Sequence, residues 1–231
     1  MTKVFNEREM LRVAQERQDF HCKIVDHPLV RATLAVMRDK NTDTADFSAA
    51  VQMLTYHLIF AATGDLQEKT VKIETPLAKM EAYDLASNIV LVPILRSGVG
   101  MLDPARAIFP SAPVLAVGVK RDEKTAEPFW YRDLDQLNDL NGGNGSVFLI
   151  LDPMLATGGS AILVAARIKE YYSQSQIKMV AMISAPEGIQ SLNKDFPDIQ
   201  ITTAAVDDHL NRKAYIVPGL GDAGDRQFGT L

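Results

Sequence analysis

An apolar run that ends in an acid and leads into a glycine-rich loop constrains this chain more than any other feature. Residues 147–160 read VFLILDPMLATGGS, so an apolar stretch is followed by Asp152, a turn with two glycines, and Ser160. Continuous apolar runs of this length are typical of strands covered on both faces in a parallel sheet. The segment therefore predicts a buried strand, a ligand-binding loop and a helix, in that order.

Further apolar runs predict the rest of the sheet. The five predicted strands span residues 89–95, 114–119, 147–151, 178–183 and 199–206. Helix-length segments lie between several of them, at 101–108, 160–172 and 189–195. Alternation of strands and helices is typical of an α/β layer fold. We expect a central parallel five-stranded sheet flanked by helices.

A helix is also predicted over residues 43–63. Asp43 or Thr44 can cap its start, and Gly64 is placed to end it. Apolar residues recur on one face at steps of four, three and four: Phe47, Val51, Leu54 and Leu58. This stripe predicts a core or subunit contact.

Two segments depart from the regular pattern of strands and helices. Residues 1–23 are rich in charged residues, include a stretch that can be helical, and are expected to form an N-terminal extension to a single domain over 24–231. Residues 122–146 contain Trp130, Tyr131 and a tip of Asn and Gly residues. Such a segment predicts a protruding β-arm that serves function or an oligomer contact.

Composition excludes several classes of protein. The 231 residues carry a formal net charge of -5, which argues against nucleic acid as the main partner. Cys22 is the only cysteine, so no intrachain disulfide is possible. The amino terminus lacks an apolar core segment and no run is long enough to span a membrane, so a cytoplasmic enzyme is expected. The four histidines have no metal-like spacing.

The loop after Asp152 has the composition of a phosphate cradle. Gly158 and Gly159 let backbone N–H groups approach a ligand closely, and the helix that follows adds its own free N–H groups. The Thr157 and Ser160 hydroxyls are further donors. The carboxylate of Asp152 suits a ribose hydroxyl or a hydrated Mg²⁺. The loop lacks the Lys of a P-loop, and the G-x-G-x-x-G match at 219–224 leaves no room for the following helix and strand.

Several longer motifs resemble one family. The blocks are DPMLATGGS at 152–160, PILRSGVGM at 93–101, APEG at 185–188, YIVPGLGDAGDRQFGT at 215–230, and HPLV at 27–30 with the Met37-Arg38 region. Together they resemble the uracil phosphoribosyltransferase family, within the type I phosphoribosyltransferase fold, over roughly residues 24–231. This resemblance implies the reaction of uracil with 5-phospho-α-D-ribose 1-diphosphate (PRPP) to give UMP and diphosphate. It also implies a hood over the site from the N- and C-terminal segments.

The resemblance implies a role for each matching residue. PRPP would be bound by Arg96, Arg121, Asp152, Pro153, Met154, Leu155, Ala156, Thr157, Gly158, Gly159, Ser160 and Asp222. Uracil would be bound by Ile216, Gly221, Asp222 and Ala223, and the catalytic residues would be Arg121, Asp152 and Asp222. With Pro153 in place of a second acid, no direct metal ligand set is expected, and Mg²⁺ would be carried mainly by PRPP.

The apolar stripe of 43–63 and the arm around Trp130 can both serve subunit contacts, so a homodimer or higher homo-oligomer is expected. The resemblance implies GTP as an activator in some members. Four positions depart from the family pattern, among them His57, where a Glu is common, and Lys213, where a His is frequent. Ser97 stands where Ala is usual, and Ala214 stands where a Gly is frequent and permits a special backbone angle.

Three other readings compete with this one. A phosphoribosyltransferase for a purine or another pyrimidine is disfavoured by the motif at 215–230. A regulatory protein of the same fold that binds RNA and senses UMP would need a basic face. A dinucleotide-dependent oxidoreductase would use Gly98 and Gly100, but Asp103 occupies the third glycine position.

Overall fold

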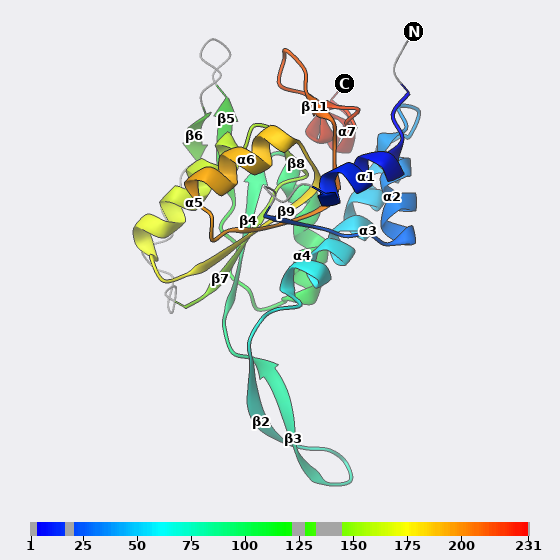
Figure 1. The fold of residues 1–231 in the computed structure, drawn as a ribbon. Coiled ribbons are helices and arrows are strands. Elements are labelled where there is room, and N and C mark those ends of the chain that lie inside the picture. Colours follow the sequence, from blue (N-terminus) through cyan, green and yellow to red (C-terminus); the bar gives the residue numbers. More distant parts are fainter. Residues whose placement is uncertain (1–3, 17–20, 122–127, 133–144, 231) are drawn as a thin grey trace.

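A mostly parallel sheet forms the centre of the molecule (Figure 1). In this computed structural model, which describes residues 4–16, 21–121, 128–132 and 145–230, the sheet order is β1-β10-β9-β7-β4-β5-β6 and β8 pairs with β9. The strands are β1 (Cys22–Ile24), β4 (Ile89–Leu95), β5 (Val117–Arg121), β6 (Pro128–Arg132), β7 (Val147–Leu151), β8 (Met154–Leu155), β9 (Gln176–Ser184) and β10 (Gln200–Val206).

The five predicted strands form the middle of this sheet and all run parallel, which confirms the expected fold class. β4 and β7 have the predicted bounds. β5 begins at Val117, three residues later than expected, because Val114 makes only an isolated bridge with Leu91. Two edge strands extend the sheet, β1 parallel to β10 and β6 antiparallel to β5.

Helices cover both faces of the sheet. One face carries α2 (Pro28–Arg38), α3 (Thr44–Thr63), the 3-10 helix η1 (Ser97–Met101) and α4 (Leu102–Ile108); the other carries α5 (Gly159–Tyr171) and α6 (Pro186–Asp195). Alternate strand residues enter the two cores, since Leu91 and Leu149 face the first layer while Val90 and Phe148 face the second. Burial on both sides explains why these strands are continuously apolar.

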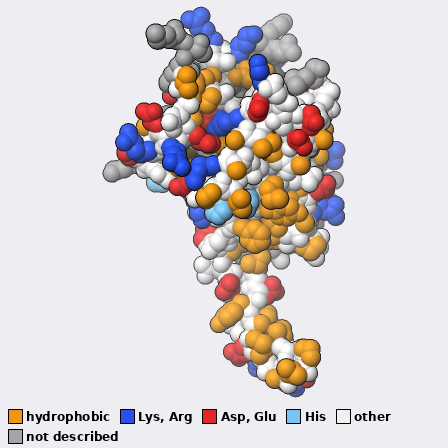
Figure 2. All heavy atoms as spheres, turned by 90° about the vertical axis from the view of Figure 1, so that its right-hand side faces the viewer, with side chains coloured by type: hydrophobic (Ala, Val, Ile, Leu, Met, Phe, Trp, Pro, Cys, Tyr) orange, Lys and Arg blue, Asp and Glu red, His pale blue; other side chains and the backbone are white. Residues whose placement is uncertain are grey.

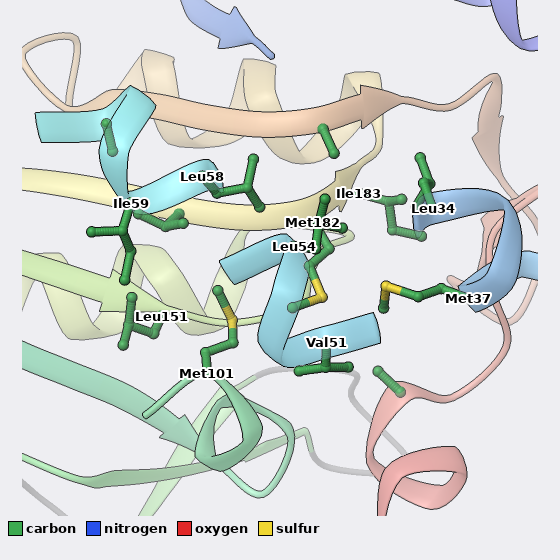
Figure 3. Packing of buried hydrophobic residues seen from close by; sticks show 14 of the residues in the cluster. Leu34, Met37, Val51, Leu54, Leu58, Ile59, Met101, Leu151, Met182 and Ile183 are labelled. Atoms are coloured by element: carbon green, nitrogen blue, oxygen red, sulfur yellow. The ribbon is translucent and has the colours of Figure 1, made fainter. Parts of the chain in front are cut away.

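Helix α3 is the centre of the first core (Figure 3). The Asp43 carboxylate caps its start by accepting a hydrogen bond of 2.8 Å from Asp46 N, and Gly64 ends it, as predicted. Figure 3 labels Val51, Leu54 and Leu58 of this helix among the buried side chains of the first core. All three are fully buried, so the predicted stripe is a core contact.

A long hairpin projects from the body of the molecule, and no sequence pattern indicated it. Strands β2 (Glu68–Glu74) and β3 (Lys79–Leu85) pair antiparallel over their whole length and stand away from the sheet (Figure 1). Nearly all of their side chains are exposed or partly exposed. Without a buried face the strands lack the apolar alternation by which a strand is recognised in sequence.

The predicted arm at 122–146 lies mostly outside the described residues. Its described part, β6, pairs antiparallel with β5 at the edge of the sheet.

None of the helices in the described part of the chain combines the length and apolar character needed to cross a bilayer.

The terminal segments lie together over one end of the sheet. They contain α1 (Glu7–Glu16), a short pair of strands β11 (His209–Leu210) and β12 (Ile216–Val217), and α7 (Ala223–Phe228). α7 packs against α3 and η1, so the end of the chain lies close to the segment that follows β4.

Candidate active site

The carboxyl ends of the parallel strands define one edge at which the predicted ligand residues meet. The connection after β4 runs through η1 and α4 on one face of the sheet, whereas the connection after β7 runs through α5 on the other face. Neighbouring strands whose connections leave in opposite directions open a crevice between their ends. Arg96 and Ser97 follow β4, and Asp152 follows β7, so all three flank this crevice.

A hydrogen bond joins the two sides of the crevice. The Ser97 hydroxyl donates to Asp152 Oδ1 at 3.0 Å. Burial raises the pKa of Asp152 to about 7, against the lowering effects of the Ser97 hydroxyl and the Met154 N–H, and the charge of Asp222 raises it further. Asp152 is thus a carboxyl group that titrates near neutral pH, with Asp222 within electrostatic reach.

The loop after Asp152 is held by backbone hydrogen bonds. The Pro153 carbonyl accepts from Met182 N and Ile183 N at 3.0 and 3.1 Å, and the Leu155 carbonyl accepts from Ala185 N at 2.9 Å. The Leu155 side chain is buried in the core, so this residue can offer a ligand only its backbone. Ala156 and Thr157 complete the turn into α5.

The start of α5 is open to a ligand. Gly158 is its N-cap residue with φ of 83° and has no side chain to cap the first turn, which begins with Gly159 and Ser160. The Thr157 hydroxyl accepts from Gly159 N at 3.5 Å, the longest distance for a hydrogen bond. The N-terminus of a helix with free N–H groups favours an anion. The predicted cradle therefore has the backbone that phosphate binding requires.

Gly188 supports this loop from below. A Cβ at this position would lie 2.4 Å from the Ala156 carbonyl oxygen and 2.8 Å from the Leu155 carbonyl oxygen. Only a residue without a side chain allows α6 to approach the loop so closely. The APEG block thus packs directly against the loop that forms the predicted cradle.

Arg96 reaches across to the carboxy-terminal segment. Its Nη2 donates to Asp225 Oδ1 at 2.7 Å and its Nη1 donates to Thr230 Oγ1 at 3.4 Å. The Arg96 side chain is 56% exposed, and its guanidinium lies 5.8 Å from the Phe228 ring centroid. The hydrogen bonds from Thr230 and Arg96 lower the pKa of Asp225. This exposed guanidinium is available to an anion at the edge of the sheet.

The predicted uracil segment folds back over the same edge. Ile216 is buried in the first core, whereas Gly221, with φ of 83°, is exposed. Asp222 caps α7 by accepting a hydrogen bond of 3.0 Å from Asp225 N. Ala223 is fully buried, so its side chain faces the core and its backbone lies at the turn.

A buried ion pair anchors this segment, and its function was not predicted from the sequence. Arg38 donates from Nη2 and Nη1 to the two carboxylate oxygens of Asp207, at 2.6 and 2.9 Å, and from Nη1 to the Gly219 carbonyl at 2.9 Å. The Asp207 carboxylate also accepts from Gly219 N at 2.8 Å. Asp207 follows an apolar strand just as Asp152 does, and that pattern was the available signal.

A second arginine fixes α7. Arg226 donates to the carbonyl oxygens of Met37, Leu220 and Asp39, the last two at 2.8 and 2.5 Å. Its guanidinium lies 4.4 Å from the centroid of the Phe47 ring. The carboxy-terminal segment is therefore tied to the end of α2 by charge-assisted hydrogen bonds, which are among the stronger hydrogen bonds in proteins, and to α3 by a cation–π contact.

The structure thus brings most of the predicted site residues to one edge. Arg121 ends β5 at the carboxyl edge of the sheet, but its side chain lies outside what the structure describes. Among the described residues no cluster of three or more His, Cys, Asp or Glu side chains could hold a metal ion. Two of the predicted site acids, Asp152 and Asp222, lie within electrostatic reach of each other.

Comparison with known proteins places the chain in a family. Residues 24–230 match the family model for uracil phosphoribosyltransferase. Proteins with that name from Campylobacter curvus, Malacoplasma penetrans and Levilactobacillus brevis are 42%, 44% and 46% identical over 210, 207 and 211 residues. Each alignment covers 90% of this chain and 98% of the relative.

Solved structures agree with this placement. A protein of Aquifex aeolicus superposes with a TM-score of 0.83 and 33% identity, over 90% of this chain and 97% of that one. An adenine phosphoribosyltransferase from Trypanosoma brucei shares the fold alone, with a TM-score of 0.51 and 10% identity over 82% and 84% of the two chains. The chain belongs to the uracil phosphoribosyltransferase family.

Proposed function

We propose that the crevice between β4 and β7 is the active site at which this chain converts uracil and PRPP to UMP and diphosphate. The observation that carries the proposal is the return of the carboxy-terminal segment onto the phosphate cradle. Asp222 lies close enough to Asp152 to raise its pKa, and Arg96 is hydrogen-bonded to Asp225. Residues matched to PRPP and residues matched to uracil therefore share one edge of the sheet.

PRPP would be held at its two charged ends. The loop 155–160 and the N-terminus of α5 would bind the 5′-phosphate, because free N–H groups and the helix dipole favour an anion there. The guanidinium of Arg96 would bind the diphosphate, since its fork can pair with two phosphate oxygens. Arg121 is proposed for the same end of PRPP from the carboxyl end of β5.

The chemistry exchanges one bond at the ribose for another. The bond from C1 of the ribose to the diphosphate oxygen breaks, and a bond forms from C1 to N1 of uracil. The transition state resembles an oxocarbenium ion, with negative charge growing on the leaving diphosphate. Arg121 would stabilise that charge, and ionised Asp152 would bind the ribose hydroxyls. Asp222 would accept the N1 proton of uracil.

Backbone groups would choose the base. Ile216, Gly221, Asp222 and Ala223 would present backbone N–H and C=O groups to uracil. A backbone N–H directed at the O4 carbonyl of uracil would meet the amino group of cytosine instead. An unpaired donor buried against that amino group disfavours cytosine strongly.

Mg²⁺ is the proposed cofactor, carried mainly by PRPP. Asp152 fits this role because a single carboxylate supplies one or two oxygen ligands and leaves the others to PRPP and water. Bound Mg²⁺ would neutralise charge on the diphosphate.

Assembly as a homo-oligomer is also proposed. Helix α3 buries one face, yet it exposes Met53, Tyr56 and Phe60 on the other, Phe60 to 68%. Figure 2 shows hydrophobic side chains gathered above the hairpin on the side where α2 and α3 lie in Figure 1. Exposed apolar patches of this kind mark contact surfaces. Light scattering on the protein and on Phe60→Glu tests this, with a monomeric wild type as the contrary result.

GTP as an activator and a cytoplasmic location complete the proposal. GTP is included because it activates some members of the family, and assays with and without GTP test it. The single cysteine is consistent with a compartment in which proteins carry no disulfides.

A product assay tests the function. Purified protein would be incubated with PRPP and Mg²⁺ and, separately, with uracil, cytosine, hypoxanthine or orotate, and nucleotides would be separated by chromatography. We expect UMP from uracil alone, and a loss of at least about 100-fold in kcat/KM for Arg96→Ala. Arg106→Ala, an exposed arginine in the last turn of α4, is the matched control.

Other results would redirect the proposal. A nucleotide from another base would identify a different phosphoribosyltransferase. Folded protein that makes no product but binds UMP would instead be a nucleotide sensor of the same fold.

A further inference from the structure

The N-terminal helix α1 lies outside the family match, which begins at residue 24. It nevertheless packs against the folded domain. Ala14 is 6% exposed and belongs to the second core, and α1 contacts β10. A cavity of about 200 Å³ separates the helix from the carboxyl end of β10, where Val206 and Asp207 form part of its wall. Helix α1 is therefore placed beside the anchor of the carboxy-terminal segment.

Glu7 makes the charged contact between this helix and the anchor. Its Oε1 lies 4.0 Å from Arg38 Nε. Both atoms are buried, and neither has a hydrogen-bond partner among the described residues. A buried carboxylate oxygen and a buried guanidinium N–H are each costly without a partner, so each compensates the charge of the other.

Arg38 connects Glu7 to the carboxy-terminal segment. Its two terminal nitrogens are already committed to Asp207 and to the Gly219 carbonyl, and Asp207 in turn accepts from Gly219 N. Nε has no hydrogen-bond partner among the described residues, and Glu7 faces it. The N–H and the carbonyl of Gly219 are thus both held by Arg38 and Asp207, and Glu7 of α1 adds a third charge to this network.

We propose that Glu7 is a positioning residue for uracil binding, acting through Arg38 and Asp207 on the loop at Gly219. The inference rests on the proposed role of residues 215–230 in binding uracil. Loss of the Glu7 charge removes one of the two carboxylates that face the Arg38 guanidinium, leaves Asp207 as the other, and loosens the hold of Arg38 on the loop. The phosphate cradle is held by β9 and α6 through separate bonds, so binding of the 5′-phosphate of PRPP does not depend on Glu7.

Steady-state kinetics of Glu7→Gln in the full chain test the proposal. We expect the KM for uracil to rise about three- to tenfold, as for loss of one charged contact, with kcat and the KM for PRPP changed less than about twofold. Glu9→Gln is the matched control, because Glu9 lies in the same first turn, is exposed and carries the same charge. It should match the wild type. Equal effects of the two variants, or equal changes in both KM values, would overturn the proposal.

A double-mutant cycle with Arg38→Lys separates positioning from a general loss of stability. If Glu7 acts through Arg38, its substitution adds little to the uracil KM once Arg38 is replaced. Additive effects would contradict the proposed route. The wild-type assay distinguishes failure of this inference from failure of the proposed function. If the wild type forms UMP and Glu7→Gln has the same KM for uracil, only the inference about Glu7 is wrong. If the wild type forms no UMP, the proposed function is wrong.

Discussion

The Ser97 hydroxyl and the Asp152 carboxylate form a 3.0 Å hydrogen bond across the crevice between β4 and β7. The hydroxyl acts on a carboxyl group whose pKa burial raises to about 7. The charge state of Asp152 at neutral pH is therefore sensitive to this one contact.

Replacing Ser97 by Ala should shift the pH dependence of the enzyme. The variant loses a donor that lowers the pKa of Asp152, so the pKa rises further and ionised Asp152 becomes scarcer at low pH. We expect kcat/KM for PRPP at pH 6 to fall about three- to tenfold, as for one hydrogen bond to a charged group. At pH 9 the two proteins should be equal. A uniform loss at both pH values would mean that Ser97 acts on something other than this ionisation.

Replacing Asp152 by Asn should change how stability depends on pH. Between the ordinary pKa of 3.8 and the folded value of about 7, the folded protein keeps a proton that the unfolded chain releases. The wild-type free energy of unfolding therefore falls as pH rises through this window and levels off above it. Asn removes this fall, so the variant should gain about 1–3 kcal/mol relative to the wild type between pH 4 and pH 8.

Urea unfolding without substrates measures this difference. Asp195→Asn, an exposed acid at the end of α6, is the control and should run parallel to the wild type. Parallel curves for Asp152→Asn would show that Asp152 ionises in the folded protein as it does in the unfolded chain.

Gly188→Ala should damage the phosphate cradle. The added Cβ would lie 2.4 Å from the Ala156 carbonyl, so the loop or α6 must move. A displacement of about 1 Å at a positioned substrate costs roughly 100-fold in rate, and we expect a fall of about 10- to 100-fold in kcat/KM for PRPP. Gly64→Ala is the control, since its Cβ would meet nothing closer than 3.7 Å. Normal kinetics for Gly188→Ala would show that the loop tolerates the shift.

Ala214→Gly should stabilise the protein. Ala214 has φ of 59°, a left-handed conformation that is unfavourable for any residue with a Cβ, in the turn between β11 and β12. Relief of about 1–2 kcal/mol exceeds the extra entropy of glycine in the unfolded chain, so a net gain of about 0.5–1 kcal/mol is expected. Thermal unfolding measures it. Ala78→Gly in the β2–β3 turn, where φ is not positive, should destabilise; a gain there as well would point to another cause.

Local patterns predicted much of the fold. The bounds of β4, β7 and α3 follow from apolar runs, periodicity and the caps at Asp43 and Gly64, all of which lie within the element itself. The cradle at 152–160 was also readable, because strand, acid, glycines and helix are consecutive in the chain. In each case the physical signal and the structure it specifies occupy the same short segment.

Other elements gave no such signal. The β2–β3 hairpin has no buried face, so no periodicity marks it. The sequence predicted that part of residues 1–23 can be helical, but not where that helix packs. Helix α1 packs beside β10, whose residues lie nearly 200 positions away in the chain.

The sequence by itself therefore determined the class of fold, the strand, loop and helix around residues 147–171, and the family, because contiguous motifs specify all three. Only the tertiary structure decided how the carboxy-terminal segment is held. Arg38 and Asp207 are 169 residues apart, and Arg96 and Asp225 are 129 apart. Such pairs form because the sheet brings the carboxyl ends of its strands to one edge, and no spacing along the chain records which charge will meet which.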